Sequence, residues 1–154
     1  MTPRTLFRTF AVAEAVTWAL LIAGMLLKYV VRLTDVGVSV AGPVHGFVFL
    51  TFVVVVVVVA VNQRWHAGVT LASLASAVVP FASVPVERWL DRSGRLDGTW
   101  RREATGDPRD RRPLDRLLRW VLAHPVPAVV VAVVGVVVVF AALLVVGPPV
   151  QVGE

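Results

Sequence analysis

The sequence predicts an all-α integral membrane protein: a helical bundle with four transmembrane helices and an amphipathic interfacial helix before the fourth. Hydrophobic residues make up 57% of the 154 residues, more apolar surface than a water-soluble fold would bury. Four apolar stretches reach or approach the about 20 residues that a helix needs to cross a bilayer, at 7–29, 44–61, 67–86 and 126–146. They are apolar on every face, which favours helices over the alternating strands of a barrel.

The first predicted span, 7–29, contains Glu14, an acid well inside the membrane. No A-x-A-like cleavage site ends the run, so we expect a retained helix rather than a signal peptide. A central charge offsets much of the insertion free energy of such a helix, so Glu14 needs a partner or a proton. Glu14, Thr17 and Trp18 share one helix face, which predicts an intramembrane polar site facing the bundle. Glu14 is then either a structural residue or a carboxylate that carries a proton or binds a ligand.

The second predicted span follows Pro43, which suits a helix start, and Gly46 allows another backbone to approach closely. Its depth places His45 near one membrane face, too far from Glu14 to contact it. A polar cluster is expected at that face, formed by Lys28, Tyr29, His45, Gly46, Glu87 and Arg88. His45 is interpreted as a hydrogen-bonded structural residue, and the alternative is a general base acting on lipid.

The third predicted span, 67–86, has small residues at steps of four. Gly68, Ala72 and Ser76 therefore predict a face on which helices pack closely, so that this span would be the central helix. Pro80 is expected to kink it.

A charged segment, 87–119, separates the third and fourth spans with ten arginines and seven acids. Most of it is expected to be flexible and solvated. At about 113–123, apolar residues recur at helical spacing while Asp115, Arg116 and Arg119 take the other face, which predicts an interfacial helix with Trp120 at headgroup depth. A docking site for a partner protein is the alternative. The apolar residues are Leu114, Leu117, Leu118, Val121 and Leu122.

Orientation is predicted from the basic residues. With four spans, the start of the chain, the 62–66 turn and the tail share one side with three basic residues, and the other side holds twelve. The positive-inside rule then places the 87–124 loop in the cytoplasm and both chain ends outside, although the two arginines near the start favour the opposite. The predicted domains are a three-span unit (1–92), a charged cytoplasmic loop (93–124), and a final transmembrane helix with a short tail (125–154).

Several chemistries find no support in the sequence. There are no cysteines, which removes disulfides and thiolate sites. Serine hydrolase, zinc protease and nucleotide-binding motifs do not occur, and no metal site, cofactor or catalytic residue is predicted. The net charge of +5 lies beside membrane spans, where positive flanks are expected, so nucleic-acid binding is not predicted.

The order and spacing of several short motifs resemble the DUF3817 family of small bacterial integral membrane proteins, which is marked by a His-Gly pair. The resemblance covers about 6–92 and implies a membrane protein of unknown function, usually with three spans. It implies Lys28, His45, Gly46, Glu87 and Arg88 as characteristic positions. The motifs are Glu14, Trp18, Gly24-Met25, Lys28-Tyr29, Gly42-Pro43-Val44-His45-Gly46-Phe47, Arg64-Trp65, Pro80-Phe81-Ala82-Ser83 and Glu87-Arg88.

Taken together, these features predict a small, multi-pass, non-enzymatic protein of the bacterial plasma membrane, acting as an accessory or interaction component. Its expected partners are the lipid bilayer and a membrane protein or further copies of itself. The alternative function is a proton- or cation-coupled transporter-like or small-ligand-binding module that uses Glu14.

Overall fold

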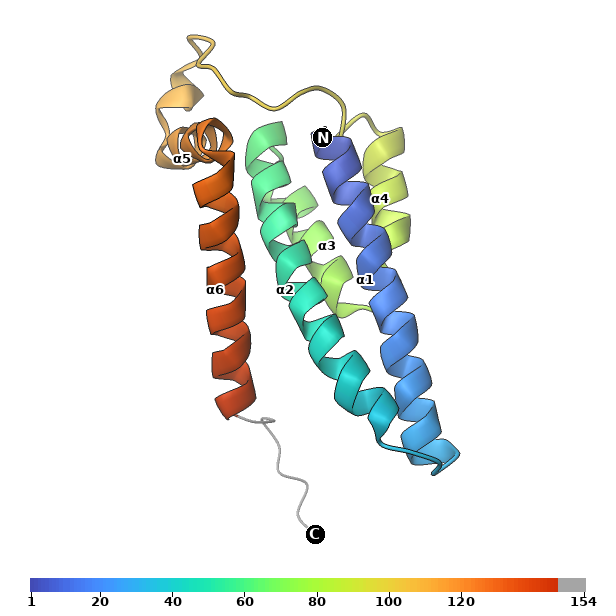
Figure 1. The fold of residues 1–154 in the computed structure, drawn as a ribbon. Coiled ribbons are helices and arrows are strands. Elements are labelled where there is room, and N and C mark those ends of the chain that lie inside the picture. The colour runs from blue at the N-terminus through green and yellow to red at the C-terminus, as the bar shows by residue number, and fades with distance from the viewer. Residues whose placement is uncertain (147–154) are drawn as a thin grey trace.

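The computed structural model describes residues 1–146, and within that range the chain is helical with no strand. The elements are α1 (Pro3–Met25), the π-helical turn η1 (Leu26–Val30), α2 (Val36–Gln63), α3 (Ala67–Val78), α4 (Ser83–Arg92), the 3-10 turn η2 (Pro108–Arg111), α5 (Pro113–Ala123) and α6 (Pro125–Val146) (Figure 1). This confirms the all-α class. The tail predicted at 147–154 lies outside the described residues.

In the described part, three helical segments are long and apolar enough to cross a membrane, namely Pro3–Val30, Val36–Gln63 and Pro125–Leu143. They correspond to the first, second and fourth predicted spans. The third predicted span, 67–86, is not one helix, and the structure divides it between α3 and α4.

Helices α1 and α2 run antiparallel and contact each other from end to end (Figure 1). The Phe7 and Phe52 rings lie 5.5 Å apart near one end. Near the other end, a Cβ atom on Gly24 would lie 2.8 Å from the carbonyl carbon of Gly37, so the two backbones touch there. Two glycines allow this close approach because neither carries a side chain.

The second helix begins earlier than expected. Residues from Val36 onward are helical, so Pro43 lies inside α2 instead of at its start. A proline inside a helix removes one backbone hydrogen bond, and α2 continues past it. The consequence is that residues after Pro43 lie deeper in the bundle than the sequence indicated.

The break between α3 and α4 follows from Pro80. The residue before a proline is disfavoured in the α conformation, and Val79 is extended with φ −93° and ψ 121°. Phe81 then adopts a positive φ of 64°. The expected kink is therefore a full reversal of the chain.

The reversal makes α3 and α4 a helical hairpin with both ends at one end of the bundle. The Ser83 hydroxyl, at the start of α4, lies 2.9 Å from the carbonyl oxygen of Ala11. Asp91, at its other end, accepts a hydrogen bond of 2.7 Å from Arg4 at the start of α1. With 12 and 10 residues, the two helices are about 18 and 15 Å long, roughly half the hydrocarbon thickness.

The packing face predicted on 67–86 is displaced by one position. Gly68 and Ala72 are exposed, and only Ser76 of the predicted three is buried. The buried face of α3 consists of Val69, Ser73, Ser76 and Ala77. Gly68 and Ala72 thus lie outside the contact, while the small residues Ser73, Ser76 and Ala77 lie within it beside Val69.

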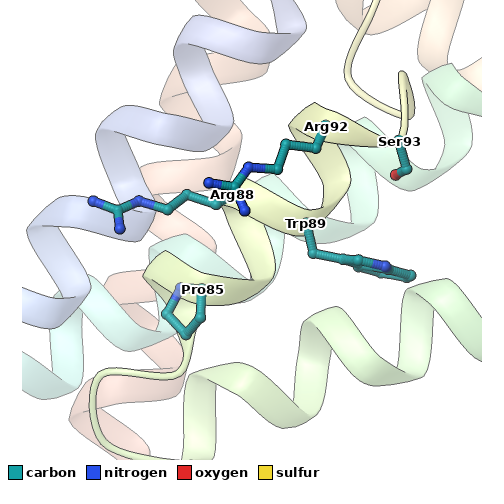
Figure 2. A pocket seen from close by; sticks show the side chains of 5 residues that line it. All are labelled: Pro85, Arg88, Trp89, Arg92 and Ser93. Atoms are coloured by element: carbon teal, nitrogen blue, oxygen red, sulfur yellow. The ribbon is translucent and has the colours of Figure 1, made fainter.

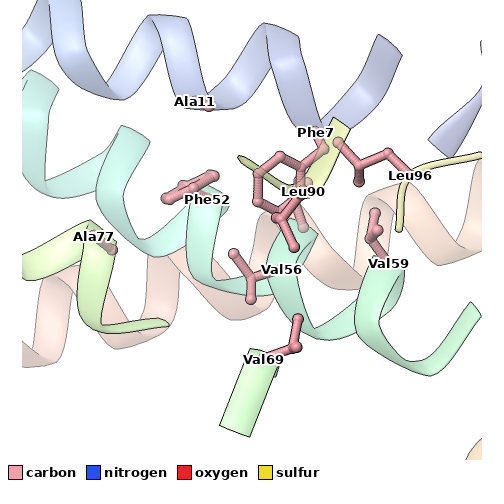
Figure 3. Packing of buried hydrophobic residues seen from close by; sticks show 10 residues of the cluster. Phe7, Ala11, Phe52, Val56, Val59, Val69, Ala77, Leu90 and Leu96 are labelled. Carbon is pink, nitrogen blue, oxygen red and sulfur yellow. The ribbon is translucent and has the colours of Figure 1, made fainter. Parts of the chain in front are cut away.

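The core lies in the half of the bundle that contains the hairpin. Figure 3 shows Phe7, Phe52 and Leu90 converging from three helices. Leu96, which follows α4, completes the cluster from the loop. The buried apolar residues of this cluster are Phe7, Ala11, Phe52, Val55, Val56, Val59, Val69, Ala77, Leu90 and Leu96.

The last two helices pack at the side of the bundle. Helix α5 occupies the predicted range, lies crosswise at the end of α6 (Figure 1), and buries Leu118 while Leu114 and Leu117 stay exposed. Helix α6 contacts α2, where the Phe140 ring covers Gly46. Nearly all of its other described side chains are exposed.

The hairpin changes the predicted topology. Since α3 and α4 return to the end from which they start, the chain start, the 93–112 loop and α5 lie at the same end of the bundle (Figure 1). The prediction that the chain start and the charged loop lie on opposite sides is therefore wrong. The α1–α2 connection, at 31–35, lies at the other end.

Candidate functional site

Glu14 is fully buried where α1 meets the start of α4. Its Oε2 atom lies 2.5 Å from the Ser83 hydroxyl, which also lies 2.9 Å from the carbonyl oxygen of Ala11. Ser83 is the first residue of α4, where helical N–H groups are unpaired and the partial charge is positive. The one acid well inside the predicted spans therefore joins α1 to the hairpin directly after its turn.

The hydrogens available at Ser83 indicate whether a protonated or an ionised Glu14 fits this arrangement. A serine hydroxyl has one hydrogen, and a carbonyl oxygen can only accept. If the Ser83 hydroxyl donates its hydrogen to the Ala11 carbonyl, it has none left for Glu14. The contact between Ser83 and Glu14 Oε2 is then a hydrogen bond only when Oε2 carries a hydrogen and donates it to the Ser83 oxygen. A protonated Glu14 thus satisfies both contacts and avoids a buried charge.

Two further polar atoms at this level have no partner within the described residues. Glu14 Oε1 and Trp18 Nε1 are both buried without a hydrogen bond. They belong to residues four positions apart on α1, which share a face. The intramembrane polar site is thus only partly satisfied by the protein's own groups.

His45 lies in the same region. Its Nδ1 atom is 3.0 Å from the Thr17 hydroxyl, which is also 2.9 Å from the backbone oxygen of Glu14, and its ring centre is 4.3 Å from that of Trp18. Because the Thr17 hydrogen can go to that backbone oxygen, a neutral His45 would donate from Nδ1 and leave Nε2 as an acceptor. No hydrogen bond joins the Glu14 carboxyl group to His45 in the part of the chain described.

The prediction that His45 lies at a membrane face, far from Glu14, is therefore wrong. Since α2 begins at Val36, His45 is nine residues into the helix, about 14 Å from its start. We define the intramembrane polar site as Glu14, Thr17, Trp18, His45 and Ser83. It contains the three residues predicted on α1 and adds His45 and Ser83.

The structure does not bring the predicted interfacial cluster together. Lys28 lies 3.6 Å from Asp35, and Tyr29 is exposed beside it, at the α1–α2 connection. Glu87 and Arg88 lie at the opposite end of the bundle, where the Glu87 carboxylate is 2.8 Å from Arg8 Nε. Gly46 packs against the Phe140 ring of α6, next to His45 in the middle of the bundle. The six residues are thus divided among three regions.

A second polar region covers the end of α2 and was not predicted. We call it the charged cap: Arg64, Arg101, Asp107, Asp110, Asp115 and Arg119. Arg64 donates to Asp107 and Asp110, and Arg101 pairs with Asp115 at 2.6 Å. Arg119 donates to the Asp110 backbone oxygen at 2.7 Å. Asp115 and Arg119, predicted as the polar face of an interfacial helix, thus point into this network.

The loop that carries the charged cap is held on the ends of α1 and α2. Asn62 donates to the Thr99 carbonyl at 3.2 Å and accepts from the Arg101 backbone N–H at 2.9 Å. The Trp100 indole N–H donates to the Met1 carbonyl at 2.8 Å. Most residues of 87–119 are exposed, as expected of a solvated segment, but the loop also makes these specific contacts, which the sequence did not indicate.

Two acids of the charged cap, Asp107 and Asp110, have lowered pKa values. The Arg109 backbone N–H, 2.8 Å from Asp107, and the Arg109 side chain lower the pKa of Asp107 to about 2, with a further contribution from Arg64. The Thr105 backbone N–H, also at 2.8 Å, is the main cause that lowers the pKa of Asp110, against the effect of its burial. Both carboxylates are therefore ionised at neutral pH.

Sequence reasoning missed Ser83, Arg101 and Asp110 as parts of these sites. Ser83 belongs to a motif that carries the family resemblance, but its contact with Glu14 depends on the reversal at Pro80. Arg101 and Asp110 are two among many charged loop residues, and no local pattern distinguishes them from their solvated neighbours.

The fold and these sites define a helical integral membrane protein with several apolar helices. The model of a family described as a domain of unknown function, DUF3817, matches residues 4–92. The chain therefore belongs to the DUF3817 family. The matched range contains the hairpin and every residue of the intramembrane polar site.

One relative is a much longer protein than this chain. The Streptomyces coelicolor protein named "Putative membrane protein SCO5905" is 41% identical over 103 residues, which are 66% of this chain and 12% of the relative. The chain thus corresponds to a small part of that protein's length. No solved structure matches the chain.

Proposed function

We propose that this protein is a non-enzymatic accessory module of the bacterial plasma membrane. The observation that carries the proposal is that two pairs of buried polar side chains join the protein's own helices. Glu14 contacts Ser83 across α1 and α4, and Thr17 contacts His45 across α1 and α2. The proposed partners are the bilayer and a membrane protein or further copies of this chain.

Two observations support an accessory role over a catalytic one. The similar region makes up only 12% of the Streptomyces relative, as expected for a module that is combined with other segments. His45, the candidate general base, is buried beside Thr17, which lies about 20 Å from either end of the helical segment Pro3–Val30. It is therefore distant from the lipid headgroups on which a lipid-modifying enzyme acts.

The proposed orientation places the charged cap in the cytoplasm. Thirteen basic residues lie at the end of the bundle with the hairpin and the loop, and two lie at the α1–α2 connection. The two arginines near the chain start now agree with the loop instead of opposing it. The helix α5 exposes Leu114, Leu117 and Trp120, which supports an interfacial position on that side.

Cysteine labelling in intact cells tests this orientation, because the chain has no cysteine of its own. Leu33→Cys, at the α1–α2 connection, is expected to react with a membrane-impermeant maleimide from outside. Thr99→Cys, in the loop, is expected to react only after permeabilisation. With four complete spans, both positions would lie on the same side, so identical labelling would contradict the proposed topology.

The variant Glu14→Gln tests the accessory role itself. Glutamine retains a hydrogen-bond donor for Ser83. If the protein is an accessory module, we therefore expect the variant to fold and to associate with its partner or with further copies of itself equally well at every pH. Association is measured by cross-linking in native membranes, with Glu14→Leu as the variant that removes the polar group. Normal folding with loss of a pH-dependent solute flux in vesicles would contradict the accessory proposal.

The second candidate function is a proton- or cation-coupled transporter-like or small-ligand-binding module, and the unpaired Glu14 Oε1 favours it. That atom is buried without a partner within the described residues, and a buried carboxyl group inside a membrane is a candidate for proton binding. The flux measurement on Glu14→Gln separates this function from the first. An unchanged flux in the folded variant would exclude this role for Glu14.

A further inference from the structure

We propose that the outer face of α4 binds the phosphate of an anionic phospholipid through Arg88 and Arg92. Helix α4 divides its charges between two faces. Glu87 and Asp91 face α1, where they pair with arginines. Arg88 and Arg92, the next residues along the helix, are exposed, and neither makes an ion pair within residues 1–146.

The two arginines border an open hollow of about 450 Å³, lined by Pro85, Arg88, Trp89, Arg92 and Ser93. Figure 2 shows that Arg88 and Arg92 extend to the same side of α4. They are four residues apart, so their guanidinium groups are neighbours on the helix surface. Guanidinium groups bind phosphate oxygens through paired N–H donors, and no acid lines the hollow.

The position of α4 along α1 sets the depth of this hollow in the membrane. Glu87 lies beside Arg8 and Asp91 beside Arg4, within the first two turns of the helical segment Pro3–Val30. That segment has 28 residues, so it is about 42 Å long and extends roughly 6 Å beyond each side of a hydrocarbon core of about 30 Å. The neighbouring Arg88 and Arg92 therefore lie at the level of the headgroup phosphates.

The remaining lining suits a lipid better than a soluble anion. Trp89 is 44% exposed, and exposed tryptophans favour the headgroup layer because the ring is apolar and its N–H is polar. The Arg95 guanidinium lies 4.8 Å from the Trp89 ring centre, which holds that ring in place. Pro85 and Trp89 line the same hollow and give it apolar surface for the start of an acyl chain, with Trp89 extending to the other side of α4 from the two guanidinium groups (Figure 2).

Native mass spectrometry of the full-length protein in mild detergent tests the proposal, with phosphatidylglycerol as the added lipid. Arg88→Gln/Arg92→Gln is expected to bind it about 30-fold more weakly, from the typical contribution of two arginines near anionic lipid. The matched control is Arg102→Gln/Arg111→Gln, which removes two exposed loop arginines that also lack an ion pair in the described chain. Arg88→Lys/Arg92→Lys is expected to retain part of the binding because the charge remains.

Each outcome decides the proposal. Selective loss of phosphatidylglycerol binding in Arg88→Gln/Arg92→Gln, with the control unchanged, supports it. Equal loss in both double variants would show a general charge effect and overturn it. Equal binding of phosphatidylcholine, or displacement of the lipid by millimolar inorganic phosphate, would also overturn it, because the hollow would then not select an anionic lipid.

Discussion

Arg8 Nε lies 2.8 Å from Glu87 Oε1, and this ion pair joins the first turns of α1 to the returning arm of the hairpin 79 residues later. Arg8 also contacts Asp91 at 3.2 Å, so one guanidinium holds two acids of α4. The Glu87 side chain is nearly buried while Arg8 is half-exposed. The pair therefore fixes the end of α4 at the level of the chain start.

Replacing Arg8 by alanine is expected to loosen α4 and lower the thermal stability of the protein in detergent. The reason is that Glu87 would remain buried without its partner. The midpoint of thermal unfolding measures the effect, with Arg102→Ala as the control for loss of a loop charge. A midpoint equal to that of the control would contradict the role given to the pair.

Replacing Ser83 by alanine is expected to lower the free energy of unfolding by about 1 to 3 kcal/mol, because a buried Glu14 oxygen loses its hydrogen-bond partner. Unfolding in SDS, followed by circular dichroism, provides the measurement. Ser39→Ala serves as the control, since that exposed hydroxyl bonds only to the carbonyl of Val36 within α2. Equal stability of the two variants would show that the Glu14–Ser83 contact does not stabilise the fold.

Gly24→Ala is expected to separate α1 from α2, because its Cβ atom would lie 2.8 Å from the backbone of Gly37. The typical cost of such overpacking is about 1 to 3 kcal/mol. Gly135→Ala in α6 is the matched control, since a Cβ atom there meets nothing within 4 Å. Both are measured by SDS unfolding, and a Gly24→Ala protein as stable as the Gly135→Ala protein would contradict the close contact.

The charged cap is expected to weaken only in strong acid. Folding lowers the pKa of Asp110 and lowers that of Asp107 from 3.8 to about 2. A lowered carboxyl pKa contributes stability that is fully present above the unfolded value and is lost as the pH falls through the folded value. Protection of the Thr105 and Arg109 amides from hydrogen exchange, corrected for intrinsic rates, should therefore be constant from pH 7 to 5 and decrease between pH 4 and 2.

The variant Asp107→Asn provides the control for that pH series. It cannot ionise, so the Arg109 amide should exchange faster at pH 7, and its protection should change less in acid than in the unmodified protein. Loss of protection near pH 6 in both proteins would indicate that groups other than these aspartates hold the loop.

The sequence was sufficient for those features that depend on local composition. Long apolar segments identified the membrane class and three of the spans, and helical spacing identified the range of α5. Glu14, Thr17 and Trp18 were placed on one buried face because a helix repeats every 3.6 residues. These features follow from short-range geometry, which the residue order alone determines.

The rest was decided by contacts between distant residues. Pro80 marked an irregularity, but whether the chain kinks or reverses depends on the pairing of Arg4 and Arg8 with α4 and of Ser83 with α1. The reversal in turn placed the charged loop beside the chain start and moved Glu87 away from His45. Long-range ion pairs and the start of α2 at Val36 carry no local sequence signal, so the hairpin, the charged cap and the membership of His45 in the intramembrane polar site required the tertiary structure.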